Sequence, residues 1–159
     1  MNQFEKLLRV LVDEGVEFVI IGGVAAYHHG SSRVTLDLDI LYGRSPANIA
    51  RLVHALAPVH PYLRGAPKGL PFHFDALTVQ KGLNFTLITD SGPLDCLGEV
   101  AGIGRYEAVL PRSHDAELFG LRCKFLDLDA LIDSKRAAGR MKDLDAIAEL
   151  EAIREERKK

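Results

Sequence analysis

The chain has 159 residues, of which 47% are hydrophobic and 26% are charged, and its net charge at pH 7 is −2. This length and balance predict a single folded domain over residues 1–159 and exclude a disordered chain. The small negative charge argues against a general electrostatic grip on nucleic acid, so we expect no DNA partner. The first residues show no signal-peptide pattern, and no apolar run is long enough to cross a bilayer. We therefore expect a cytoplasmic protein with no membrane partner.

The first sixty residues alternate between helical and extended patterns. Apolar residues recur at helical spacing before Gly15, and a β-branched apolar run follows that glycine. Gly30 is placed to close a short helix, and Ser45–Pro46 is placed to open the next. These patterns predict helices over 4–12, 23–29 and 46–56, and strands over 16–21 and 36–41.

The second half begins with a segment rich in proline and glycine, residues 58–71, which predicts a surface loop near one edge of the site. Residues 72–80 fit helix and strand equally well. The remaining patterns predict strands and then two helices separated at Gly139. The strands are expected at 84–89, 94–97, 116–119 and 122–125, and the helices at 128–138 and 142–155.

Three aspartates in strand-like surroundings are the candidates for chemistry. Strand alternation has a period of two, so Asp37 and Asp39 should point to the same side. Asp95 stands in a later apolar strand, where an unpaired charge is costly. If the two strands are neighbours, three carboxylates converge, and oxygen-rich sites with open positions suit Mg²⁺. The alternative is that Asp37 and Asp39 lie on an exposed edge strand and Asp95 in a turn.

Other polar residues fit structural roles. Asp127 precedes a strong helical pattern and is expected to cap that helix. Lys135, Arg140 and Lys142 alternate with acidic residues and could form a solvated helix face. The histidines lack the spacing of a zinc site, and the two widely separated cysteines, Cys96 and Cys123, fit reduced thiols.

The order of these motifs resembles the nucleotidyltransferase-fold superfamily of DNA polymerase β type. Gly22–Gly23, the pair Asp37 and Asp39, and the isolated Asp95 match its three-part pattern. More narrowly, the chain is similar to the small bacterial minimal and toxin-like nucleotidyltransferases, which also share a basic C-terminal pattern. The resemblance implies an α+β fold in which a small mixed sheet is flanked by helices and followed by a C-terminal helical pair.

The resemblance also implies an activity and residue roles. NMP would pass from an NTP to a hydroxyl of an unknown acceptor, with release of pyrophosphate. Asp37, Asp39 and Asp95 would be catalytic and would bind two Mg²⁺ ions, for which Mn²⁺ is an alternative. The nucleotide would be bound by glycine backbone amides and by polar or basic side chains. The expected nucleotide-binding residues are Gly22, Gly23, Ser32, Arg33, Thr35, Lys135, Arg140 and Lys142.

Several points stay open at this stage. The NTP, with ATP among the candidates, is not specified, and the acceptor could be tRNA, a protein or a small molecule. Many members of this superfamily carry serine where this chain has Gly23, so a hydroxyl contact to phosphate would have to come from Ser31 or Ser32. The small size leaves room for a partner protein or a homo-oligomer. The alternative function is a catalytically inactive nucleotide-binding protein, or a toxin–antitoxin component that binds its partner.

Overall fold

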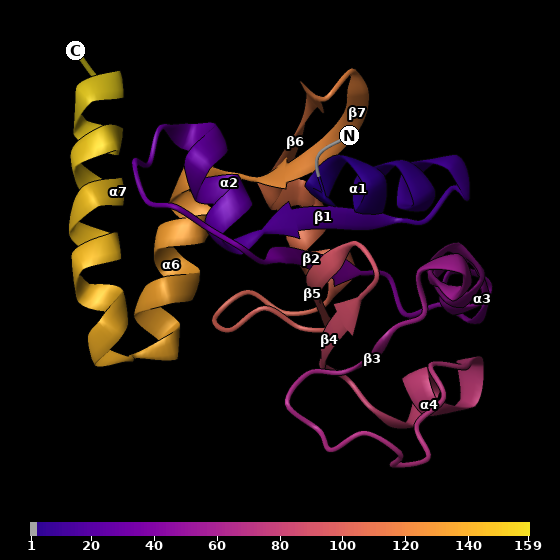
Figure 1. The fold of residues 1–159 in the computed structure, drawn as a ribbon. Coiled ribbons are helices and arrows are strands. Elements are labelled where there is room, and N and C mark those ends of the chain that lie inside the picture. The colour runs from indigo at the N-terminus through magenta and orange to yellow at the C-terminus, as the bar shows by residue number, and fades with distance from the viewer. Residues whose placement is uncertain (1–2) are drawn as a thin grey trace.

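A mixed sheet of seven strands, in the order β3-β4-β5-β2-β1-β7-β6, runs through this computed structural model, which describes residues 3–159 (Figure 1). The central strands are parallel between β1 and β7 and between β2 and β5, and antiparallel between β1 and β2. The strands are β1 Phe18–Ile21, β2 Leu38–Tyr42, β3 Tyr62–Leu63, β4 Phe85–Thr89, β5 Gly92–Leu97, β6 Ser113–Leu118 and β7 Leu121–Leu126.

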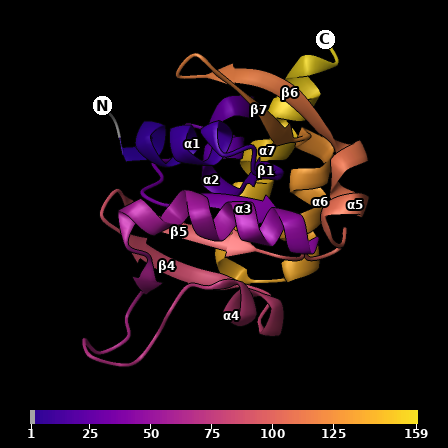
Figure 2. The ribbon, with the colours of Figure 1, turned by 90° about the vertical axis from the view of Figure 1, so that its right-hand side faces the viewer.

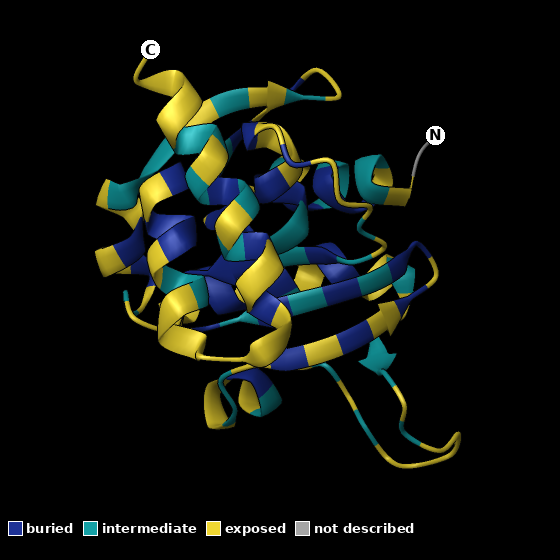
Figure 3. Cartoon of the chain, turned by 90° about the vertical axis from the view of Figure 1, so that its left-hand side faces the viewer, coloured by how far each residue is buried: buried dark blue, intermediate teal, exposed yellow. Residues whose placement is uncertain are grey.

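Helices cover both faces of the sheet. Helices α1 and α3 lie on one face, and α2, α6 and α7 lie toward the other (Figures 1 and 2). Exposed residues run along the outer side of the two C-terminal helices, while their inner sides are buried (Figure 3). The helices are α1 Gln3–Asp13, α2 Gly22–His29, α3 Pro46–Leu56, α4 Ala76–Lys81, α5 Tyr106–Val109, α6 Leu128–Ala138 and α7 Leu144–Arg157, with 3-10 turns at Ala57–Val59, Leu110–Arg112 and Met141–Asp143.

The position of the central strands in the core explains why their sequences are continuous runs of apolar residues. Val19 and Ile20 of β1 and Leu38, Ile40 and Leu41 of β2 are fully buried, because helices cover both faces of these strands. The local signals also hold: Gly30 ends α2 with a φ of 115°, and the Ser45 side chain accepts a hydrogen bond from the Asn48 amide at the start of α3. The α+β fold with a mixed sheet and a C-terminal helical pair is confirmed.

Some boundaries differ from the sequence expectation. Strand β2 begins at Leu38, so Leu36 and Asp37 precede it. The ambiguous segment becomes the short helix α4, whose N-cap Asp75 accepts a hydrogen bond from the Thr78 amide. Helix α7 begins at Leu144 rather than at residue 142, so Lys142 lies in the preceding 3-10 turn and outside the helix in which it was expected.

The expected role of Asp127 is half right. It occupies the N-cap position of α6, but its side chain makes no capping hydrogen bond. Its carboxylate instead lies 2.6 Å from Nδ1 of His114 on β6. None of the helices within residues 3–159 is long and apolar enough to cross a membrane.

Candidate active site

The register of the central strands brings two of the three aspartates together. Asp39 on β2 is the direct partner of Asp95 on the parallel strand β5. On its other side, Asp39 is paired with Ile21, the last residue of β1, directly before α2 begins. The carboxylates therefore lie beside the N-terminus of α2. The alternative of an exposed edge strand is wrong for Asp39, since β2 is an interior strand.

The Asp39 carboxyl group is electrostatically unusual. Its Oδ1 atom is buried and has no hydrogen-bond partner among residues 3–159. Burial is the largest cause of a raised pKa at Asp39, followed by repulsion from Asp95, a side-chain hydrogen bond with Asp95 and repulsion from Asp37. Together they raise this pKa from 3.8 to about 7, although the nearby Arg64 opposes the rise. A buried carboxylate with an unsatisfied oxygen is costly unless a cation or a proton joins it.

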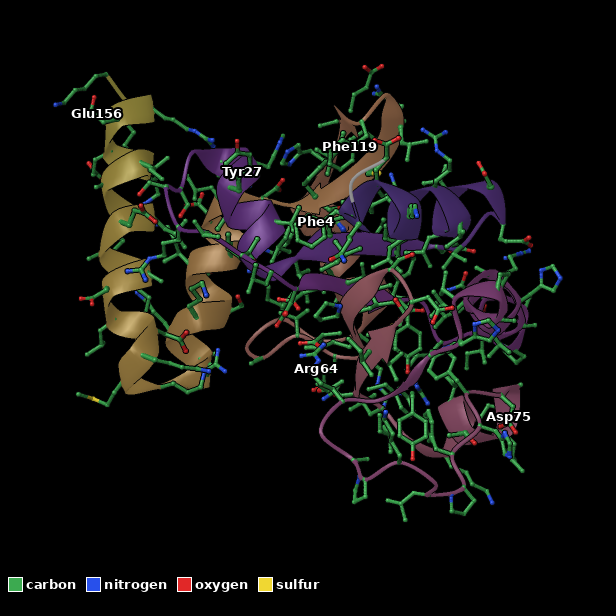
Figure 4. All side chains as sticks on the ribbon, viewed as in Figure 1. Phe4, Tyr27, Arg64, Asp75, Phe119 and Glu156 are labelled. Atoms are coloured by element: carbon green, nitrogen blue, oxygen red, sulfur yellow. The ribbon has the colours of Figure 1, made fainter. Side chains whose placement is uncertain are left out.

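Arg64 pairs with two of the three carboxylates, and the sequence analysis did not identify it. Its Nη2 atom lies 2.6 Å from Asp95 Oδ1, and its Nη1 atom lies 3.5 Å from Asp37 Oδ2. Arg64 follows β3 in the proline-rich segment and lies beside β4 (Figure 4). The segment predicted as a surface loop, residues 58–71, does reach these carboxylates, but it also contains the short strand β3 Tyr62–Leu63, so the loop prediction is only partly right. No local pattern distinguishes Arg64 from the other arginines. The sequence offered one general argument for such a residue: three carboxylates that lie close together require a positive charge nearby.

Asp37 joins the site from outside the strand. Its side chain is partly exposed, and its carbonyl oxygen accepts a hydrogen bond of 3.1 Å from the Thr35 hydroxyl. This hydrogen bond stabilises the turn that leads into β2. Thr35 therefore helps to position Asp37, and it does not line the cavity beside Asp39 and Asp95.

The two glycines permit the close packing of α2 against these residues. A Cβ atom at Gly22 would overlap the Asp39 carboxylate, and Gly22 has a φ of 65°, a conformation that favours glycine. A Cβ atom at Gly23 would lie 2.7 Å from the Thr35 Cβ and Oγ1 atoms. The serine common at this position in the resembled family would therefore need Thr35 to shift.

A cavity of about 450 Å³ opens over the carboxylates. Its lining includes Gly22, Gly23, Asp39 and Asp95 on one side and Lys135 and Arg140 on the other. Asp143, a buried residue, fixes both cations: its Oδ2 atom lies 2.7 Å from Arg140 Nε, and its Oδ1 atom lies 3.8 Å from Lys135 Nζ. The Arg140 guanidinium holds the pKa of Asp143 below its usual value. Asn84 and Glu99, which the sequence did not single out, also line the cavity.

The other expected nucleotide-binding residues lie elsewhere. The amide and hydroxyl of Ser32 both donate to Glu149 on α7, at 3.1 and 2.9 Å, and Arg33 Nε lies 3.7 Å from the same carboxylate. Ser31 also donates its hydroxyl to Glu149. Lys142 is exposed and is not part of the cavity lining.

The chemistry of these donors fits a divalent cation. Three carboxylates supply only oxygen, the donor that Mg²⁺ prefers, and the unsatisfied Asp39 Oδ1 is a free acceptor in a buried place. Within residues 3–159, no set of three acidic, histidine or cysteine side chains already stands at metal-binding spacing. The Asp37 and Asp95 carboxylates are instead paired with the Arg64 guanidinium.

Comparison with known proteins places the fold. No protein-family model and no curated protein sequence matches the chain significantly. Among solved structures, a provisionally assigned nucleotidyltransferase of Thermotoga maritima superposes with a TM-score of 0.59 at 16% identity, covering 92% of this chain and 88% of its own. The crystal structure of ANT(2″)-Ia in complex with adenylyl-2″-tobramycin gives a TM-score of 0.58 at 15% identity, covering 95% of this chain and 92% of its own.

The solution structure of the antibiotic-resistance factor ANT(2″)-Ia agrees, with a TM-score of 0.56 at 15% identity over 98% of this chain and 89% of that one. The chain thus has the fold of nucleotidyltransferases. At this level of identity the likeness concerns the fold alone, and the activity has to be argued from the residues of the site.

Proposed function

We propose that this protein is a nucleotidyltransferase that moves NMP from an NTP to a hydroxyl group of an acceptor. The observation that carries the proposal is the half-buried pair of Asp39 and Asp95, in direct register beside the Gly22–Gly23 start of α2. A core built for stability alone would not retain the buried, unsatisfied Asp39 Oδ1 atom, because a carboxylate there is costly without a cation or a proton.

The residues of the site divide the work between the metal and the nucleotide. Asp37, Asp39 and Asp95 would hold divalent ions, Mg²⁺ or Mn²⁺, which would neutralise the triphosphate and lower the pKa of the attacking hydroxyl. The backbone amides at the start of α2 suit a phosphate group, since Gly22 and Gly23 leave room for its approach.

Lys135 and Arg140 reach the same cavity from α6 and the turn after it, and they supply positive charge opposite the carboxylates. In the reaction, the acceptor oxygen forms a bond to the α-phosphorus while the bond to the β-phosphate bridging oxygen breaks. Pyrophosphate leaves, and the hydroxyl proton passes to a site carboxylate, for which we propose Asp95.

A labelling experiment would identify both the acceptor and the nucleobase of the NTP. Purified protein would be incubated with each of the four α-labelled NTPs, Mg²⁺ or Mn²⁺, and a panel of tRNA, protein and aminoglycoside acceptors. We expect label transfer with release of pyrophosphate, and no transfer by the Asp37→Asn/Asp39→Asn double variant. If no wild-type sample releases pyrophosphate or binds any NTP, the activity proposal is wrong.

A second candidate function, binding of a second copy of this chain as protein partner, rests on a separate surface. Tyr27, Val34 and Leu36 expose 67%, 89% and 76% of their surface, and Tyr27 and Val34 line an apolar hollow with Phe119. Figure 4 shows Tyr27 on α2 and Phe119 at the β6–β7 turn. Light scattering of the wild type and of a Val34→Asp variant would test it: a wild type that is monomeric at high concentration excludes a stable homo-oligomer on this surface.

A further inference from the structure

Arg64 is held on the carboxylate cluster by four polar contacts. Two contacts are the ion pairs with Asp95 and Asp37, and in the other two its Nε and Nη2 atoms donate hydrogen bonds of 3.2 and 2.7 Å to the Leu87 carbonyl on β4. Its backbone amide donates to the Thr86 carbonyl at 3.0 Å, which extends the pairing of β3 with β4. The side chain is 29% exposed, so these ion pairs are only partly screened by water.

The guanidinium neutralises part of the cluster and leaves the rest uncompensated. It contacts Asp37 and Asp95 directly, whereas the Asp39 Oδ1 atom stays buried without a partner. One positive charge faces three carboxyl groups. A divalent ion bound by the same oxygens would have to take Asp37 and Asp95 from Arg64, because two cations cannot share these atoms without strong repulsion.

We propose that Arg64 is the internal counter-ion of the metal-free site: it gives up Asp37 and Asp95 when a divalent ion binds, and then turns to the triphosphate. This inference rests on the proposed function. Arginine suits both positions, since its planar fork can donate two parallel hydrogen bonds to a carboxylate or to a phosphate.

The chain allows such a movement. Arg64 stands where regular structure ends, and residues 64–75 form neither helix nor strand. The long side chain can therefore leave Asp95 without breaking a strand. Its exchange of partners couples the two ligands: the metal ion releases the guanidinium, and the released guanidinium strengthens binding of the nucleotide.

Calorimetric titration of Mg²⁺ alone into the wild type, Arg64→Gln and Arg64→Lys tests the competition. Loss of a hydrogen-bonded ion pair that the ion must break should tighten Mg²⁺ binding by about tenfold in Arg64→Gln. Arg64→Lys keeps the charge but not the fork, so its affinity should lie between the two. Arg51→Gln is the matched control, because Arg51 pairs with Glu17 at 3.8 Å on the exposed side of α3.

A second measurement shows whether the Arg64→Gln variant is correctly folded. Thermal unfolding with and without Mg²⁺ should show a larger metal-induced rise of the melting temperature in Arg64→Gln than in the wild type. Equal or weaker Mg²⁺ binding by a folded Arg64→Gln variant, or no binding by any of these proteins, overturns the competition. The proposed function fails on a different result, the absence of NTP binding and transfer in the wild type.

Discussion

Helix α2 carries a polar cluster at each end, and the two clusters differ in how their charges are compensated. The carboxylates of Asp39 and Asp95 lie at its N-terminal end, and His28 and His29 form its last turn. The histidine end opens into the larger hollow, about 940 Å³ against about 450 Å³ over the carboxylates. Size alone would therefore select the end of α2 opposite to the proposed site.

The histidine rings at the C-terminal end of α2 find their hydrogen-bond partners within the protein. The His28 and His114 Nε2 atoms lie 3.0 Å apart, and the Asp127 carboxylate accepts from the His114 ring at 2.6 Å. The His29 Nε2 atom donates to the Leu126 carbonyl at 2.8 Å. At the other end, the buried Asp39 Oδ1 atom has no hydrogen-bond partner within residues 3–159. An unsatisfied buried polar atom, rather than a large hollow, is what marks a place for a ligand.

The largest contrast should appear when each cluster loses one member. Asp39→Asn removes a carboxylate at the site of the proposed chemistry, and we expect transfer to fall by at least about a hundredfold. His114→Asn removes a member of the satisfied cluster and should change kcat by less than about twofold while it lowers stability. Release of pyrophosphate under saturating NTP and Mg²⁺ measures both, and a comparable loss in the two variants would remove the distinction.

The next effect concerns the close approach of α2 to the carboxylates. Gly22→Ala should lower the free energy of unfolding by about 1–3 kcal/mol, from the strained φ and the overlap with Asp39, and should weaken NTP binding as well. Gly15→Ala is the matched control, because Gly15 has a similar φ of 72° and nothing within 4 Å of the added Cβ atom. Denaturant unfolding and NTP titration of both variants separate the cost of the strained φ from the cost of the overlap with Asp39. Equal losses of stability and of NTP affinity in the two variants would show that the close approach of α2 is unimportant.

The pH dependence of stability should have opposite signs at the two ends of α2. Without metal, native Asp39 keeps its proton up to about pH 7, whereas the unfolded chain releases it near 3.8. The native state thus binds more protons in that window, so the free energy of unfolding should fall as pH rises from about 4 to 7. Denaturant unfolding of the wild type and Asp39→Asn from pH 4 to 8 should show that the free energy of unfolding of the variant lacks this decline. If the two free energies change with pH in parallel, the raised pKa of Asp39 is not the cause.

The smallest effect is expected at the histidine end. Burial, followed by repulsion from His29 and His114, lowers the pKa of His28 from 6.5. The unfolded chain then binds more protons, so this contribution to stability is present above pH 6.5 and is lost as pH falls below it. His28→Asn should reduce that acid sensitivity slightly. Thermal unfolding of the wild type and His28→Asn between pH 5 and 7.5 measures the difference, and identical pH profiles would contradict the cause.

The sequence predicted the elements whose signals are local. The helix cap at Ser45, the end of α2 at Gly30 and the apolar runs of β1 and β2 each depend on neighbouring residues. The convergence of Asp39 and Asp95 depended on which strands pair, and only the resemblance to a known fold suggested it. The contacts of Arg64 with Asp95 and of Asp127 with His114 join residues from separate elements, and no local pattern encodes them.

The C-terminal basic residues show the same limit. Lys135 and Arg140 reach the cavity because Asp143 fixes them there, while Lys142, which has the same charge and a similar place in the motif, faces solvent. Spacing along the chain could not separate these three residues, since Lys135 lies in α6, Arg140 at the start of the following 3-10 turn and Lys142 within that turn.

The most direct test of the account is calorimetric titration of the four NTPs, each with Mg²⁺, into the wild type and the Asp37→Asn/Asp39→Asn double variant. The account predicts metal-dependent binding of at least one NTP by the wild type and its loss in a double variant that remains folded. Equal binding by both proteins, or no binding of any NTP by the wild type, would contradict the claim that these carboxylates form a metal and nucleotide site.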